Sequence, residues 1–337
     1  MQLSTVLAVA ICAISAHADS TPLLDALKTR ANATKFAEFL EANPDILAIY
    51  NSSSVQTIFA PTDAYFTAPL RRRDASSQQQ QLQYQYTNQL TGLENLAPPA
   101  LPGAVVHTGL TAPKAGGTQA TVSEKVTANS TTRRRQLVGT TGIRMLSGLG
   151  NSVNIINGDI PYSNGLIHST DGFFTIPSPL STTINSTGLS SLGSLLSTAN
   201  LSSTFDSADS VTIFTPSNAA FSAAANSTGN AATLPNLLSN HVIPNFLGYL
   251  PALTDGATYQ TLAGETLTIS IKNGVYFVNG AKIISSNTII SNGVAHVIDK
   301  VLVPTPTPVF TGGSASLSGG NSVIMAAGAA VFALLMI

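Results

Sequence analysis

Histidine is the side chain in this sequence best suited to acid–base chemistry or metal binding near neutral pH, because its pKa lies close to 6.5. The chain has five histidines, and four of them lie beyond residue 18: His107, His168, His241 and His296. Two of these four are followed three residues later by an aspartate, in the pairs His168/Asp171 and His296/Asp299. A histidine that faces a carboxylate can act as a general base held in place by its partner. The repeated His-x-x-Asp is therefore the first pattern in which to look for catalysis.

The geometry of a strand argues against such a dyad. Apolar residues alternate around His296, which predicts a β-strand. Successive side chains of a strand point to opposite faces, so a separation of three residues places His296 and Asp299 on opposite sides. We therefore expect His296 to be half-buried and bonded to backbone groups, and Asp299 to cap a neighbouring turn.

The remaining patterns predict no chemistry. No two histidines have the i,i+4 spacing of metal ligands, and Cys12, the single cysteine, lies in an apolar leader. There is no G-x-S-x-G nucleophile motif, and no pair of carboxylates stands out. The sequence therefore predicts no catalytic residue, no bound metal and no cofactor.

The two His-x-x-Asp pairs lie in longer stretches that recur in the same order. Residues 57–66 (TIFAPTDAYF) match residues 212–221 (TIFTPSNAAF) at six of ten positions, and residues 164–177 match residues 292–304. The first pair of stretches is offset by 155 residues (212 − 57) and the second by 128 (292 − 164), so the first copy has 27 more residues between them. Two stretches repeated in one order indicate an internal duplication.

These stretches resemble the two signature segments of the fasciclin (FAS1) domain, an extracellular module associated with adhesion. In the first copy the resemblance is carried by Thr57, Phe59, Pro61, Phe66, Asn164, Gly165, His168 and Asp171. In the second copy it is carried by Thr212, Phe214, Pro216, Phe221, Asn292, Gly293, His296 and Asp299. Asn240-His241 also resembles the middle segment of the family, which is usually Tyr-His, and we find no counterpart of it in the first copy.

The resemblance implies an α+β fold with two tandem FAS1-like domains, each a β-sandwich-like wedge with helices packed at one side. The periodicity agrees, because helical spacing over residues 22–50 and 189–198 precedes short apolar runs with β-strand character. Residues 70–140 lack a hydrophobic period, so we expect long, largely disordered surface loops there. Two arginine triplets, residues 71–73 and 133–135, are expected to be solvated loop charge.

Composition limits the classes of function. At 337 residues the chain has room for about two domains of 100–200 residues. Its charged share of 9% is well below the roughly 25% of ordinary soluble domains, so solubility depends on uncharged polar side chains or on attached sugar. A formal net charge of −1 gives no basic face for nucleic acid.

Both ends of the sequence carry apolar segments typical of processing signals. Residues 1–18 end in Ala-His-Ala, the small-x-small pattern of a signal-peptidase site. Residues 323–337 are shorter than the about 20 residues that cross a bilayer, and they follow small residues and a polar spacer. That arrangement is typical of a GPI-anchor signal, with Gly313 as the expected attachment residue and Gly312 or Ser314 as alternatives. A short transmembrane helix is the other interpretation.

The expected organisation has five parts. They are a signal peptide (1–18), a degenerate first FAS1-like domain with long loops at about 70–140 (19–177), a second FAS1-like domain (178–304), a Pro/Ser/Gly spacer with the anchor (305–322) and a removed tail (323–337). Six N-x-S/T sequons predict N-glycosylation at surface positions, namely Asn32, Asn51, Asn129, Asn185, Asn200 and Asn226.

The resulting hypothesis is a GPI-anchored, N-glycosylated protein of the plasma membrane or cell wall, similar to fungal members of the FAS1 family. The resemblance implies adhesion through cell-surface or matrix proteins or glycans, with no nucleic-acid partner and no enzymatic activity. Two alternatives stay open. One is a structural cell-wall mannoprotein, and the other is an extracellular small-ligand-binding protein or enzyme, which a deep pocket with convergent polar groups would favour.

Overall fold

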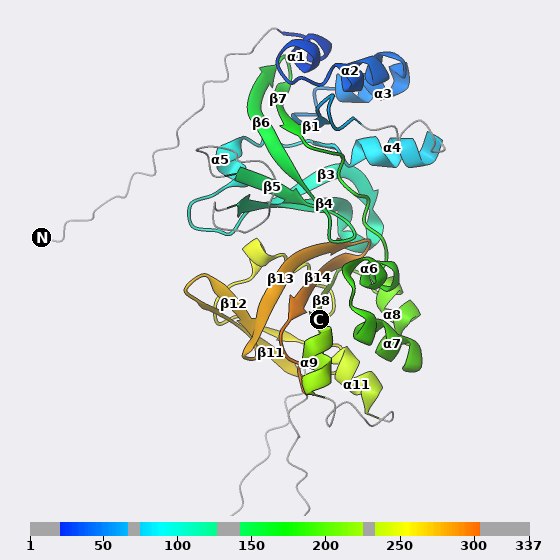
Figure 1. The fold of residues 1–337 in the computed structure, drawn as a ribbon, viewed down its shortest axis with the longest axis vertical. Coiled ribbons are helices and arrows are strands. Elements are labelled where there is room, and N and C mark those ends of the chain that lie inside the picture. Colours follow the sequence, from blue (N-terminus) through cyan, green and yellow to red (C-terminus); the bar gives the residue numbers. More distant parts are fainter. Residues whose placement is uncertain (1–20, 67–74, 127–141, 225–232, 304–337) are drawn as a thin grey trace, which may run out of the picture. The chain divides into compact units, whose positions relative to one another are not determined.

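Two seven-stranded sheets, one in each half of the chain, form the framework of the structure (Figure 1). The computed structural model describes residues 21–66, 75–126, 142–224 and 233–303. We refer to the described residues up to 177 as the first unit and to those from 178 as the second unit.

The first sheet has the strand order β2-β1-β7-β6-β5-β4-β3, and the second has β9-β8-β14-β13-β12-β11-β10. The strands of the first are β1 (Thr57–Pro61), β2 (Tyr86–Thr87), β3 (Val105–Ala112), β4 (Gly117–Val126), β5 (Gly142–Leu146), β6 (Ser152–Tyr162) and β7 (Gly165–Thr170). Those of the second are β8 (Val211–Pro216), β9 (Val242–Ile243), β10 (Thr258–Gln260), β11 (Thr266–Lys272), β12 (Val275–Val278), β13 (Ala281–Ile290) and β14 (Gly293–Ile298).

The two sheets share one topology. In each, the strand with the TIF residues pairs in parallel with the strand that contains the histidine of His-x-x-Asp: β1 with β7, and β8 with β14. The other strand pairs are antiparallel. The duplicated stretches are therefore neighbouring central strands, which is why both recur together.

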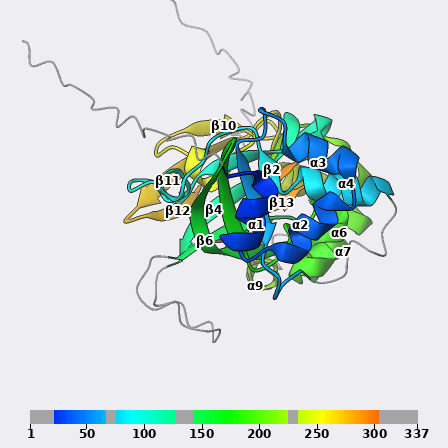
Figure 2. The ribbon, with the colours of Figure 1, turned by 90° about the horizontal axis from the view of Figure 1, so that it is seen from above.

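Most of the helices cover one face of each sheet. In the first unit the helices are α1 (Leu23–Thr29), α2 (Thr34–Glu41), α3 (Pro44–Tyr50), α4 (Ala75–Gln83) and α5 (Leu93–Leu96), with a 3-10 turn η2 (Pro113–Ala115). The short α5 packs with Phe59 on the other side of the first sheet. In the second unit the helices are α6 (Leu180–Thr187), α7 (Ser190–Thr198), α8 (Ser202–Ser207), α9 (Asn218–Ala223) and α11 (Leu234–Ser239), with η3 (Leu250–Ala252). Seen from above, α1 to α4 lie to one side of β4 and β6 (Figure 2).

The apolar residues at helical spacing supply the cores. Leu23, Leu27, Phe36 and Leu40 are buried on α1 and α2 and pack against Ile58 and Ile167 of the first sheet. α6, α7 and α8 bury a corresponding set against the second sheet. A separate cluster lies on the other side of each sheet, around Phe59 in the first unit and Phe214 in the second. The α+β class with helices packed at one side is confirmed.

The expectation of long loops over residues 70–140 is wrong for the part that the structure describes. Residues 75–126 contain two helices and the β3–β4 hairpin. Exposure alternates along β3, where Val106, Thr108 and Leu110 are buried. The apolar period is interrupted in the sequence because polar side chains fill inward positions: Thr108 and Thr121 donate to backbone carbonyls at 2.8 and 2.6 Å. Both arginine triplets lie outside the described residues.

A fifth apolar cluster joins the two units. Ala120, Val122 and Leu146 of the first unit pack against Tyr249, Ile289 and Val294 of the second. Among the residues that the structure describes, no helix is long and apolar enough to cross a membrane. The expected leader and anchor segments lie outside those residues.

Candidate functional site

His296 lies at the centre of a buried hydrogen-bond network. Its ring is 0% exposed, so it is fully and not half buried. Nε2 lies 2.8 Å from the carbonyl oxygen of Gly248, and Nδ1 accepts the backbone N–H of Asn287 at 3.3 Å. Because a carbonyl can only accept, Nε2 carries the hydrogen and the ring is neutral.

Asn287 and Thr212 complete the arrangement. Asn287 has a left-handed backbone (φ 56°) within an irregular part of the β13–β14 ladder, which turns its N–H toward the ring. Its Oδ1 accepts the N–H of Leu250 at 2.7 Å. The Thr212 hydroxyl donates to the carbonyl of Phe246 and accepts the N–H of Gly248, both at 2.7 Å. Three side chains therefore hold the loop 246–250 against the sheet, and we call Thr212, Asn287 and His296 the second clasp.

The first unit repeats this network contact for contact. His168 Nε2 lies 2.7 Å from the Thr91 carbonyl oxygen, and Nδ1 accepts the N–H of Asp159 at 3.2 Å. Asp159 is also left-handed (φ 54°), and its Oδ1 accepts the N–H of Leu93 at 2.9 Å. The Thr57 hydroxyl donates to the Gln89 carbonyl at 2.7 Å and accepts the Thr91 N–H at 2.9 Å. Thr57, Asp159 and His168 form the first clasp, which holds the loop 89–93.

Burial sets the protonation state of these rings. It lowers the pKa of His296 from 6.5 to about 4, against a smaller opposing effect of the bond to Gly248. The pKa of His168 is also lowered by burial, while the Thr91 bond and the charge of Asp159 oppose the shift. A second proton on either Nδ1 would face a backbone N–H donor, so the neutral ring is the form that fits.

The aspartates of His-x-x-Asp do not contact the histidines through any bond among the described residues. Asp299 Oδ1 accepts the N–H of Lys282 at 2.7 Å, and its own N–H donates to the Lys282 carbonyl at 3.0 Å. Asp171 does the same with Asn154, where Oδ1 accepts the backbone N–H at 2.7 Å. Each aspartate thus extends strand pairing beyond the end of its strand, where a turn cap was expected.

His241 fixes the end of the second unit in another way. Its Nδ1 donates to the carbonyl of Leu237 at 2.7 Å, and its Nε2 accepts the N–H of Leu302 at 2.9 Å. Asn240 donates to the carbonyl of Leu302 at 3.0 Å. Burial lowers the pKa of His241 to about 4, with the Leu237 bond opposing the shift. The Asn-His pair therefore binds both backbone groups of one residue.

The first unit has a counterpart of this segment, contrary to expectation. β2 pairs with β1 as β9 pairs with β8, which aligns Tyr84-Gln85 with Asn240-His241. Gln85 Oε1 accepts the N–H of Phe174 at 2.7 Å, as His241 accepts that of Leu302. Gln81 donates to the Phe174 carbonyl at 2.6 Å. The resemblance in sequence does not extend to this segment because an amide takes the place of the histidine, although Tyr84 stands where the resemblance leads us to expect a tyrosine.

The other positions of the family motifs are structural in both units. Phe59 and Phe214 lie against the clasp rings, with centroid distances to His168 and His296 of 5.4 and 5.7 Å. Pro61 and Pro216 are buried strand ends, whereas Phe221 is buried and Phe66 half-buried under the helices.

The Asn-Gly pairs that begin residues 164–177 and 292–304 lie where the backbone packs closely against neighbouring segments. A Cβ on Gly165 or Gly293 would lie 1.9 Å from the carbonyl oxygen of Gln56 or Val211. Asn164 donates to the Asn51 carbonyl at 3.0 Å. Asn292 donates to the carbonyls of Phe205 and Ala208 at 2.8 and 2.7 Å.

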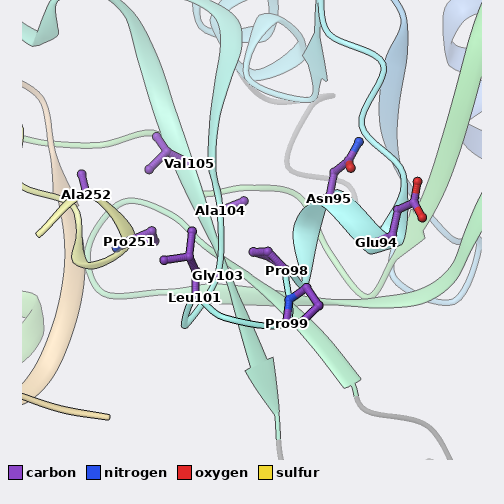
Figure 3. Close-up of a pocket in the computed structure, with 10 residues that line it drawn as sticks. All are labelled: Glu94, Asn95, Pro98, Pro99, Leu101, Gly103, Ala104, Val105, Pro251 and Ala252. Atoms are coloured by element: carbon purple, nitrogen blue, oxygen red, sulfur yellow. The ribbon is translucent and has the colours of Figure 1, made fainter. Parts of the chain in front are cut away.

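An open hollow of about 720 Å³ lies where the units meet (Figure 3). Pro251 and Ala252 lie on one side of it and Glu94 and Asn95 on the other, with residues 98–105 between them. Among the described residues that line it, only Glu94 and Asn95 have polar side chains. No group of three potential metal ligands occurs in the described parts of the chain, and His107 is exposed.

The sequon asparagines that the structure describes, Asn32, Asn51, Asn185 and Asn200, are all exposed. Asn129 and Asn226 lie outside the described residues, as do Gly312, Gly313 and Ser314.

Residues 187–304 match the family model of the fasciclin domain. Fasciclin-like arabinogalactan protein CTB11 of Cercospora beticola is 33% identical over 195 residues, which cover 56% of this chain and 52% of that protein. Fasciclin-like arabinogalactan protein elcF of Phaeosphaeria nodorum is 30% identical over 202 residues, which cover 60% and 62%. The chain thus spans less than two thirds of either relative.

One solved structure is that of a FAS1 domain pair from the insect cell adhesion molecule fasciclin I. It has a TM-score of 0.39 and 18% identity, over 81% of this chain and 97% of that one.

Proposed function

We propose that the protein is a cell-surface glycoprotein that mediates adhesion, or interaction with surface or matrix proteins or glycans, through exposed faces of its two units. One observation carries the proposal. The ring nitrogens of His168, His241 and His296, the best candidates for chemistry, are all bonded to backbone groups in buried surroundings. These side chains hold loops and strand ends in place, so we assign partner binding to exposed residues on the surface of the units.

The surface itself supports a glycosylated, non-catalytic role. Asn32, Asn51, Asn185 and Asn200 are exposed and available to carry glycans. The names of the two fungal relatives refer to arabinogalactan, a polysaccharide. The hollow between the units is open, and among the described residues its lining offers one carboxylate and one amide side chain, so it is not the deep pocket with convergent polar groups that would favour a small-ligand site.

Cell aggregation tests the proposal. Cells that display the chain should aggregate, and enzymatic removal of the N-glycans should leave aggregation largely intact, because the protein faces make the contact. The matched control is a secreted form that lacks residues 305–337. Aggregation that disappears with the glycans would favour the structural mannoprotein, and no aggregation with any displayed form would contradict adhesion.

Attachment through a GPI anchor at Gly313, or at Gly312 or Ser314, is part of the proposal and rests on the sequence pattern. Phosphatidylinositol-specific phospholipase C should release the protein from membranes, or the protein should be linked to wall polysaccharide. Mass spectrometry that finds residues 323–337 in the mature protein would contradict the anchor.

A further inference from the structure

The contact between the units uses two different surfaces. The first unit contributes Val105, Val122 and Leu146, which stand directly opposite one another across β3, β4 and β5. We call these residues, with Ala120, the sheet face. The second unit contributes what we call the loop face, which consists of Leu247, Tyr249, Ile289 and Val294.

Backbone and side-chain bonds surround this apolar contact. Gly148 forms a parallel bridge with Ile289. The Lys114 carbonyl accepts the N–H of Ser210 at 2.7 Å. Gln119 donates to the Ile290 carbonyl at 3.2 Å.

A contact between unlike surfaces is heterologous, and such a contact can repeat without end. Because the units share one topology, each has its own equivalent of both surfaces. One sheet face, on the second unit, and one loop face, on the first unit, therefore remain without a partner within the described chain.

The unpartnered sheet face, on the second unit, is polar. Strand register aligns Thr258, Thr268 and Asn279 with Val105, Val122 and Leu146, and Thr266 with Ala120. All four of these second-unit residues are exposed. The connection that helps to join the units, through Gly148, is also shorter in the second unit. Residues 147–151 lead from β5 to β6, whereas Asn279 and Gly280 lead from β12 to β13.

The remaining loop face has kept part of its apolar character. Leu90 takes the place of Leu247 and is 44% exposed. Pro161 and Leu166 pair across β6 and β7 as Ile289 and Val294 pair across β13 and β14. The end of the first unit could therefore still contact an apolar sheet face.

We infer that the exposed threonines of the second sheet face end the stacking of units, so that a second copy of the chain does not add through the contact that joins the units. A loop face placed on Thr258, Thr266 and Thr268 would remove three hydroxyls from water without giving them partners. Repeat proteins stop their arrays with polar outer faces for the same reason. The inference holds whether or not the protein is adhesive.

The test gives the second sheet face the side chains of the first, in the full chain. The variant T258V/T266A/T268V should self-associate head to tail, with a sedimentation coefficient that rises with protein concentration, while the wild type sediments as a monomer. Asn279 is left unchanged because its backbone is left-handed (φ 45°) and it accepts the N–H of Thr268 at 2.8 Å.

Two further substitutions in the triple variant distinguish association through the loop face from nonspecific association caused by the added apolar side chains. Leu90→Asp removes the apolar loop face and should restore the monomer. Ile156→Asp is the matched control, because Ile156 is 43% exposed and lies outside both faces, and it should leave association unchanged. The inference is overturned if the triple variant stays monomeric, if its association survives Leu90→Asp, or if the wild type associates in a way that Leu90→Asp abolishes.

Discussion

The two units build the same clasp but place it in different surroundings. Asn287 of the second clasp is 4% exposed, whereas Asp159 at the same place in the first clasp is exposed. The second clasp presents its loop to the other unit, and Tyr249 of that loop is buried in the contact. The first clasp presents the corresponding loop, with Gly92 in place of Tyr249, at a free end. The comparison shows that the clasp builds each unit, while residues just outside it decide what the unit contacts.

Both units have a glycine packed against a backbone carbonyl at the parallel strand pair, and this close approach should be the feature most sensitive to substitution. Gly293→Ala places a Cβ 1.9 Å from the carbonyl oxygen of Val211, within the central parallel pair, where the backbone cannot yield without loss of the sheet. We expect a loss above about 4 kcal/mol, seen as failure of the unit to fold. Gly165→Ala should act alike in the first unit.

Gly142→Ala is the control for these glycines, because its Cβ would meet Val126 at an ordinary 3.5 Å. Circular dichroism and secretion yield report the outcome. A well-folded Gly293→Ala protein would show that the close approach is not required.

Acid should destabilise the second unit more than the first. The second unit buries two histidines, whereas the first buries one and has Gln85 in place of the other. A folded-state pKa of about 4 against 6.5 unfolded means that stability is complete above pH 6.5 and falls as pH drops toward 4. At pH 5 each of His241 and His296 should cost the second unit about 2 kcal/mol.

Amide hydrogen exchange between pH 7.5 and 5 measures this difference unit by unit. Protection in β14 should fall more than protection in β7. His241→Gln copies the first unit and should reduce the acid sensitivity of the second. Equal sensitivity of both units, unchanged by this substitution, would contradict the assignment of neutral rings.

Removal of a single clasp histidine should have an intermediate effect. His296→Ala leaves the Gly248 carbonyl and the Asn287 N–H unpaired, which costs roughly 1–3 kcal/mol for such buried groups. His168→Ala should cost a similar amount in the first unit. Thermal unfolding measures the loss, and aggregation of displaying cells should be unchanged at a temperature where the variant is folded. Lost aggregation at full stability would make the histidine a binding residue.

The sequence was sufficient to predict the parts of the fold that depend on repeated patterns. The repeated stretches 57–66 and 212–221, and 164–177 and 292–304, indicated equivalent elements in the two copies, and they are neighbouring central strands. The odd spacing of His-x-x-Asp predicted that the two side chains do not face one another, and each of them bonds to backbone groups elsewhere. Residues 105–126 were missed because Thr108, Thr121 and Ser123 occupy inward positions that an apolar period does not count.

Contacts that depend on distant segments could not be predicted. Asp159 and Asn287 lie nine residues before their histidines, and only the irregular strand pairing brings their N–H groups to the rings. Gln85 was missed because the task it shares with His241, accepting one backbone N–H, does not require a histidine. The polar and apolar versions of the sheet face became comparable only when the strand registers were known.

The smallest expected effect tests whether burial is what distinguishes the clasps. Asp159→Asn gives the first clasp the residue of the second, and the amide oxygen can still accept the N–H of Leu93. Because the side chain is exposed, the free energy of unfolding should change by less than about 0.5 kcal/mol. The reverse change, Asn287→Asp, buries a carboxylate beside His296 and should cost about 1–3 kcal/mol at neutral pH, and less as acid protonates the carboxylate. Chemical denaturation at pH 7.5 and 5.5 measures both. If Asp159→Asn and Asn287→Asp changed the free energy of unfolding by equal amounts, the clasp itself, and not its burial by the neighbouring unit, would determine which side chain each position accepts.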